Sequence, residues 1–132
     1  MTRLMVETSA LVAILLEEAG WKPLAEQIVA GSAFTTCVNV FEASLAITRE
    51  RAVAPSVALE IVLDATARLA IEVTDYPAAA LPYAASARET FGAGARGLNM
   101  GDCLSYAAAR SSRARLLYVG EDFERTDVND PS

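Results

Sequence analysis

The sequence predicts an α/β fold, a three-layer α/β/α sandwich around a short, mainly parallel central sheet. Short apolar runs, which are typical of buried strands, alternate with longer helical stretches along the chain. The 132 residues suit a single domain, and neither a repeat nor a linker divides residues 1–132. Ligands of such sheets bind beyond the carboxyl ends of the strands, so a functional site is expected among the residues that follow each strand.

The first half of the chain is predicted to form two strands and three helices. Thr8 or Ser9 can cap the first helix, Gly20 stops it, and Pro23 suits the first turn of the next helix. In order, the predicted elements are a strand at 4–6, a helix from 8 or 9 to about 18, a helix from 23 to 31, a strand at 33–36 and a helix from 36 or 39 to about 51.

The second half continues the alternation. The glycine-rich run 92–97 is predicted to be a flexible loop, and Gly120 closes the last clear strand. In order, the predicted elements are a helix from 55 to about 70, a strand at 71–73, a helix from 75–77 to about 92, a helix from about 101 to 113, a strand at 116–119, and a tail from 126 with a turn and a final short edge strand.

Composition excludes several kinds of chemistry. The chain has no histidine, which removes Ser-His-Asp and Cys-His catalysis and nearly all zinc sites with nitrogen ligands. Its net charge is −6, so nucleic acid is expected to bind only through local arginines or a metal, and a basic protein would suit it as a partner. Chemistry must therefore come from carboxylates, hydroxyls, arginines or a hard metal ion.

The same composition indicates a cytoplasmic protein without a membrane segment. The longest apolar run, residues 10–16, is far shorter than the roughly 20 residues of a spanning helix. No basic segment followed by an apolar run opens the chain, so no secretion signal is expected. Cys37 and Cys103 show no motif spacing, which favours a reduced cytoplasmic protein.

Four carboxylates occupy positions that this topology would bring to one edge of the sheet. Glu7 directly follows the first strand, and Glu42 lies on the first turns of the helix after the second. Asp102 opens a helix behind the glycine loop, and Asp122 follows the last clear strand. Converging carboxylates repel one another unless a cation lies between them, and oxygen-only ligands select Mg²⁺ or Mn²⁺. The pattern therefore favours a metal site that supports hydrolysis without histidine.

Each acid also has an ordinary structural explanation. Asp102 could serve only as a helix cap, and Glu42 could be a solvated residue on a helix face. Glu7 is harder to explain as solvated, because it lies between Val6 and the apolar run 10–12.

Four segments resemble, in chain order, the motifs of the VapC toxins, which are PIN-domain proteins. They are residues 5–11 (MVETSAL), 39–43 (NVFEA), 98–107 (LNMGDCLSYA) and 117–128 (LYVGEDFERTDV). The third is the most specific, and together the four cover essentially the whole chain.

The resemblance implies a PIN domain and a metal-dependent endoribonuclease, the toxin of a type II toxin–antitoxin module. Glu7, Glu42, Asp102 and Asp122 would be the catalytic residues and would hold Mg²⁺, with Mn²⁺ as a substitute, while Thr8 would support them with its hydroxyl. A metal-activated water would hydrolyse the RNA phosphodiester. The resemblance further implies a homodimer and a VapB-like antitoxin, and operator DNA would be bound only through that antitoxin.

One position departs from the family pattern, because the first acid is ordinarily aspartate and here it is Glu7. The extra methylene moves the carboxylate by roughly a bond length, and a misplacement of about 1 Å can cost on the order of a hundredfold in rate. Three explanations are open. The site is naturally adjusted around Glu7, or the domain is weakened or inactive, or Glu7 is an introduced substitution that lets a toxic protein be produced. The alternative function is thus a weakened or inactive PIN-fold module that only pairs with an antitoxin. The fourth acid also has a rival, because Glu121 adjoins Asp122.

Overall fold

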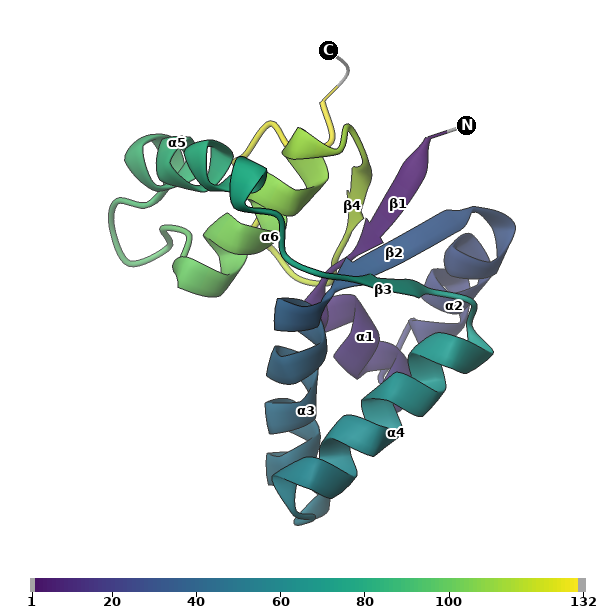
Figure 1. Ribbon diagram of the computed structural model, residues 1–132. Helices are drawn as coiled ribbons and strands as arrows, with labels where there is room; N and C mark the ends of the chain where they lie inside the picture. The colour runs from purple at the N-terminus through teal and green to yellow at the C-terminus, as the bar shows by residue number, and fades with distance from the viewer. Residues whose placement is uncertain (1, 131–132) are drawn as a thin grey trace.

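The computed structural model describes residues 2–130 and is built on a four-stranded parallel sheet with the strand order β3-β2-β1-β4 (Figure 1). The strands are β1 (Arg3–Val6), β2 (Ser32–Thr36), β3 (Glu72–Thr74) and β4 (Arg115–Leu117). In the register of the sheet, Met5 of β1 lies opposite Phe34 of β2 and Leu116 of β4. All three pairings are parallel, which confirms the predicted α/β class.

Helices cover both faces of the sheet, as the three-layer prediction requires. They are α1 (Thr8–Leu15), α2 (Trp21–Ala30), α3 (Cys37–Arg51), α4 (Pro55–Arg68), the 3₁₀ helix η1 (Ala78–Ala80), α5 (Leu81–Phe91) and α6 (Met100–Ser111). Leu4 and Val6 point into a core shared with α1 to α4, whereas Met5 points into a second core shared with α5 and α6. Alternate side chains of β1 thus enter opposite cores, as the two-residue period of a strand dictates.

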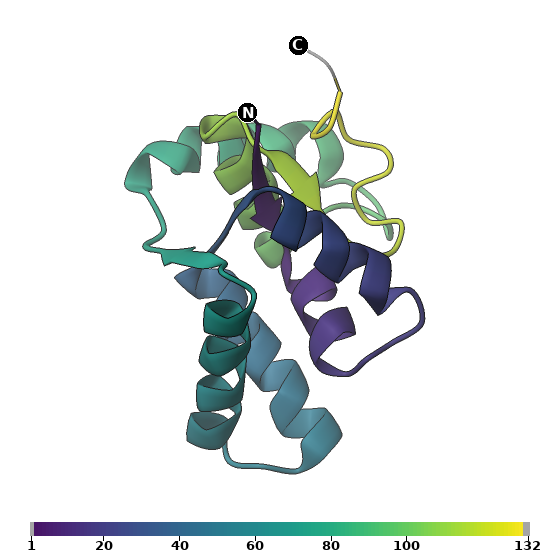
Figure 2. The same ribbon diagram turned by 90° about the vertical axis from the view of Figure 1, so that its right-hand side faces the viewer.

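Helices α3 and α4 form an antiparallel pair that extends away from the sheet, as Figures 1 and 2 show. The turn between them passes through Ala52, whose φ of 52° is left-handed. At the other end of α3, Thr36 caps the helix and joins it directly to β2. The first turns of α3 are therefore fixed at the carboxyl end of the sheet. Within residues 2–130, no helix is both long and apolar enough to cross a membrane.

The prediction of a final edge strand after Thr126 is wrong for the residues that the structure describes, because turns replace it there. A side chain instead forms hydrogen bonds with the free backbone groups at the open edge of β4. The Leu116 N–H donates to Asn129 Oδ1 at 2.8 Å, and Asn129 Nδ2 donates to the Leu116 carbonyl at 2.9 Å. A single side-chain amide thus makes the two hydrogen bonds that a neighbouring strand would make.

Candidate active site

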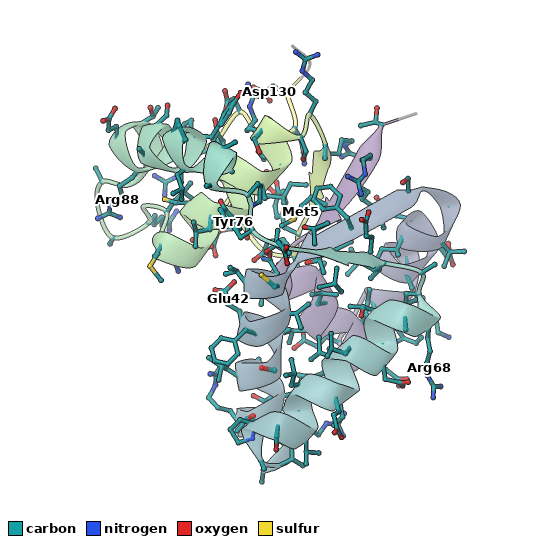
Figure 3. All side chains as sticks on the ribbon, in the orientation of Figure 1. Met5, Glu42, Arg68, Tyr76, Arg88 and Asp130 are labelled. Carbon is teal, nitrogen blue, oxygen red and sulfur yellow. The ribbon has the colours of Figure 1, made fainter. Side chains whose placement is uncertain are left out.

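The four acids predicted from the sequence lie on segments that follow the strands or begin a helix. Glu7 follows β1 and caps α1, Glu42 lies on the first turns of α3, and Asp102 is in the first turn of α6. Asp122 lies in the loop after β4. Figure 3 shows Glu42 at the end of α3 that lies nearest the sheet.

Mutual electrostatic effects show that these carboxylates are neighbours. Glu42 and Asp102 both raise the pKa of Glu7, after the larger effect of its burial. Burial is also the main cause of the raised pKa of Asp102, and Asp122 and Glu42 raise it further. Two carboxylates raise each other's pKa only when they are close. The acids therefore form one cluster of carboxylates.

Glu7 is a buried carboxylate that closes the N-terminus of α1. It accepts a hydrogen bond from the Ser9 N–H at 3.0 Å and another from the Ser9 hydroxyl. Burial raises the pKa of Glu7 to about 7, because the removal of water outweighs the two hydrogen bonds that favour its charged form. The Ser9 oxygen also accepts from the Val119 N–H at 2.8 Å, which ties this corner to the segment after β4.

Glu42 is held between α1 and α6. The Thr8 hydroxyl donates to Glu42 Oε1 at 2.8 Å. On the other side lies Gly101, and a Cβ at that position would overlap Glu42 Oε2. The glycine of the third sequence motif therefore leaves room for the second acid. Thr8, the hydroxyl that the resemblance implied as a support, thus contacts one of the four predicted acids.

Behind Thr8 lies the buried side chain of Asn39, which begins the second motif and was a candidate start of the helix, but was not predicted to belong to the site. Asn39 Nδ2 donates to Thr8 Oγ1 at 3.0 Å and to Ser105 Oγ on α6 at 2.9 Å. Its Oδ1 accepts from the Thr36 hydroxyl at 2.6 Å. One amide thus joins the end of β2, the start of α1 and α6. The spacing of Thr36, Asn39 and Glu42, each three residues apart, is the sequence signal that could have indicated one polar helix face.

The N-cap of α6 is Asn99 and not Asp102, which lies at the third helical position and contributes to the cap from there. The Asp102 N–H donates to Asn99 Oδ1 at 2.8 Å, and its Oδ2 accepts from the Asn99 N–H at 3.2 Å, so the two residues form a capping box. Asp102 also lines an open cavity together with Asp122 and Glu121. Asp122 contributes to the raised pKa of Asp102, so these two carboxylates interact directly.

The donor chemistry of the cluster fits a hard divalent cation, because it offers only oxygen ligands and an excess of negative charge. The positions of the side chains, in contrast, do not yet form a metal-binding site. Within residues 2–130, no three acidic or cysteine side chains are placed so that they could jointly hold a metal ion. The Glu7 carboxylate is engaged by Ser9, and Glu42 by Thr8. A metal would therefore require side-chain adjustment within a cluster that the backbone already brings together.

Comparison with known proteins identifies the family. The family model described as PIN domain matches residues 4–129. The chain is 37% identical to a VapC ribonuclease of Rhizobium meliloti, covering 93% of this chain and 97% of that protein. It is 31% identical to Ribonuclease VapC30 of Mycobacterium tuberculosis, covering 95% of each. The chain therefore belongs to the PIN-domain family and, within it, to the VapC ribonucleases, which are metal-dependent in general.

Solved structures show the same fold. VapC20 of Mycobacterium tuberculosis, a sarcin–ricin loop cleaving toxin, aligns with a TM-score of 0.66 at 18% identity over 92% of each chain. VapBC2 of Rickettsia felis, bound to a DNA fragment from its promoter, aligns with a TM-score of 0.72 at 15% identity. That alignment covers 96% of this chain and 94% of the other. At these identities the likeness confirms the three-layer fold.

Proposed function

We propose that this chain is the endoribonuclease toxin of a type II toxin–antitoxin module and that Glu7, Glu42, Asp102 and Asp122 form its catalytic centre. The observation that supports this site is the electrostatic coupling of these acids at the carboxyl end of the sheet. Mg²⁺ is the proposed cofactor and Mn²⁺ its substitute, because both prefer oxygen ligands.

In this proposal the protein positions carboxylates around the scissile phosphate. Glu42 is held by Thr8, and Asp102 is held at the start of α6 by Asn99. A bound divalent cation would lower the pKa of water and offset the charge of the phosphate. Glu7, with a pKa raised to about 7 by its burial, is close to half-protonation at neutral pH.

The proposed partners follow from the charge of the chain and from its relatives. A VapB-like antitoxin would neutralise the toxin, and the net charge of −6 suits a basic partner. VapBC2 of Rickettsia felis is bound to promoter DNA, and we propose that this chain reaches operator DNA only through its antitoxin. A homodimer and a cytoplasmic location complete the proposal.

The test is cleavage of single-stranded RNA by the purified chain with Mg²⁺, Mn²⁺ or EDTA. We expect cleavage that EDTA abolishes and that Glu42→Gln and Asp102→Asn each lower at least a hundredfold. Glu60→Gln is the matched control, because it removes one carboxylate from an exposed position on α4. Cleavage that persists in EDTA would refute the metal mechanism.

The alternative is a module that binds an antitoxin without cleaving RNA. Glu7 favours it, because this carboxylate is longer than the family's usual aspartate and is engaged by Ser9. Calorimetric titration with Mn²⁺ separates the two functions, since an inactive module should bind the metal weakly and leave RNA intact in every metal.

A further inference from the structure

We propose that Arg96 and Arg125 form a binding site for backbone phosphates of RNA beside the carboxylate cluster. This inference rests on the proposed function, and it names residues that contact the substrate away from the acids. The main observation is that the two arginines lie at the same cavity as two of the acids. Both arginines line the open cavity that also contains Asp102 and Asp122. An adjoining cavity is again lined by both arginines and by Asp122.

The loop that carries Arg96 is fixed by backbone contacts. The Leu98 N–H donates to the Phe91 carbonyl at 2.9 Å, and the Gly97 N–H donates to the Gly94 carbonyl at 3.1 Å. Gly97 packs so tightly on Gly92 that a Cβ would overlap the Gly92 carbonyl. Leu98 is itself buried in the core against α6. The glycines that sequence analysis assigned to a flexible loop therefore hold Arg96 at the rim of the cavity.

The segment that carries Arg125 is anchored in the same core. Phe123 is buried there and packs against Tyr118, with 5.1 Å between ring centroids. The Thr126 N–H donates to the Phe123 carbonyl at 3.1 Å. Arg125 thus projects from a short turn whose base is fixed, while its own side chain is exposed. Both arginines are presented on ordered backbone, which lowers the entropic cost of binding a ligand.

Among residues 2–130, neither guanidinium makes a salt bridge. In residues 2–130 the salt bridges within 4.0 Å involve Arg3, Arg68 and Arg110. Arg96 and Arg125 make none there, although the chain has 17 acidic residues against 11 basic ones. Several other arginines of the described residues also make no salt bridge, so the distinguishing feature of Arg96 and Arg125 is their position at a cavity lined by Asp102 and Asp122. Guanidinium groups that are free at such a site can bind an external anion.

The anion that fits is a phosphate of the substrate backbone. A nuclease of net charge −6 cannot attract RNA by its overall charge, so local cations must offset the repulsion from its own acids. Glu121 and Glu124 line the same cavity and add to that repulsion. The planar guanidinium binds phosphate oxygens in a bidentate manner, and such contacts position the strand without reading its sequence. Arg96 and Arg125 would therefore hold backbone phosphates next to the one being cleaved.

The experiment measures binding of a fluorescent single-stranded RNA by anisotropy, in EDTA, across a series of salt concentrations. Each phosphate contact contributes about 0.7 to the slope of log affinity against log salt for a single strand. We expect Arg96→Ala and Arg125→Ala each to weaken binding severalfold and to reduce the slope by about 0.7. In cleavage assays with Mn²⁺, both variants should raise KM severalfold and leave kcat within about twofold.

Arg51→Ala is the matched control. It removes the same charge from an exposed arginine at the far end of α3, roughly 13 Å along the helix axis from Glu42 at 1.5 Å per residue. This control should leave the slope unchanged.

Unchanged slopes in both cavity variants, or no salt-dependent binding by the unaltered chain, would overturn the inference. Loss of antitoxin binding with unchanged RNA binding would assign the arginines to the protein partner and would overturn it as well. The proposed function is judged separately, by metal-dependent cleavage in the unaltered chain. RNA binding through both arginines without cleavage would therefore refute the function and keep the inference.

Discussion

Gly101 at the start of α6 lies against the Glu42 carboxylate of α3 so closely that a methyl group on its Cα would overlap Oε2. Gly101→Ala should therefore displace the carboxylate, which Thr8 holds from the other side. We expect the affinity for Mn²⁺ and the rate of RNA cleavage to fall at least tenfold. The free energy of unfolding should change by less than about 1 kcal/mol, because alanine favours the helix by a similar amount.

Calorimetric titration with Mn²⁺ and thermal unfolding of the same samples check this expectation. Gly31→Ala is the control, since a Cβ there meets only the Gln27 carbonyl at 3.6 Å, an ordinary contact. If Gly101→Ala retained full metal affinity, the close packing of α6 on Glu42 would have no bearing on the site.

Asn39→Ala removes the amide that joins Thr36, Thr8 and Ser105. Unfolding should become easier by about 1–3 kcal/mol, the usual cost of leaving buried polar partners unsatisfied. Because Thr8 loses the donor behind it, the Glu42 carboxylate should be held less firmly, and we expect Mn²⁺ affinity to fall severalfold.

A matched control separates this positioning role from simple loss of stability. Thr66→Ala removes another buried polar side chain, whose hydroxyl donates to the Leu63 carbonyl within α4. It should lower the melting temperature without changing Mn²⁺ affinity. Equal metal affinities for Asn39→Ala and Thr66→Ala would show that Asn39 is only structural.

The sequence was sufficient for those parts of the fold and site that depend on local pattern. The apolar run ending at Val6 and the acid directly after it place Glu7 at a strand end, whatever the packing. Capping preferences likewise gave Thr36, with Asn39 as the other candidate, as the start of α3, and they placed Asp102 in the first turn of α6, whose cap is Asn99. These signals depend on neighbouring residues, so one sequence carries them.

Long-range side-chain contacts could not be predicted in this way. Asn39 and Ser105 are 66 positions apart, and their hydrogen bond exists only once α3 and α6 have packed. Asn129 replaces an edge strand because its amide fits the Leu116 backbone, a match that strand propensity does not measure. The engagement of Glu7 by Ser9 depends on a rotamer, which the sequence leaves open.

The stability of the metal-free protein should depend on the protonation of Glu7. Its pKa rises from 4.5 to about 7 on folding, mainly through burial. A carboxyl with a raised folded pKa favours the folded state fully below the unfolded value, and the contribution is lost as pH rises from about 4.5 to 7. The loss is about 3 kcal/mol, at 1.36 kcal/mol per pKa unit.

Glu7→Gln should remove this dependence. We expect the variant to unfold at a higher temperature than the original chain at pH 8 in EDTA, with the difference vanishing near pH 4. Thermal unfolding followed by circular dichroism measures both chains, and Glu50→Gln, an exposed position, serves as the control. A difference that stays constant from pH 4 to pH 8 would mean that Glu7 titrates normally.

Glu7→Asp should raise Mg²⁺-dependent RNA cleavage, and with it toxicity on expression. Magnesium tolerates little error in ligand position, and the family resemblance places a shorter acid here. The Glu7 carboxylate accepts two hydrogen bonds from Ser9, and we expect its extra methylene to push the oxygens into space that an ion or water would need. Aspartate is a preferred N-cap, so the variant should still close the start of α1. The removed buried methylene costs about 1 kcal/mol, which the fold should tolerate.

Cleavage rates for both chains, with Mg²⁺ and with Mn²⁺, decide the matter. The matched control is Glu42→Asp, which removes the same methylene from an acid that the resemblance places as glutamate. That variant should lower cleavage, because a shorter side chain loses the hydrogen bond from Thr8. The gain at position 7 should be larger with Mg²⁺ than with Mn²⁺, since Mg²⁺ demands the more regular geometry. If Glu7→Asp instead lowers cleavage, the neighbours of Glu7 have adapted to glutamate, and its length is part of the working site.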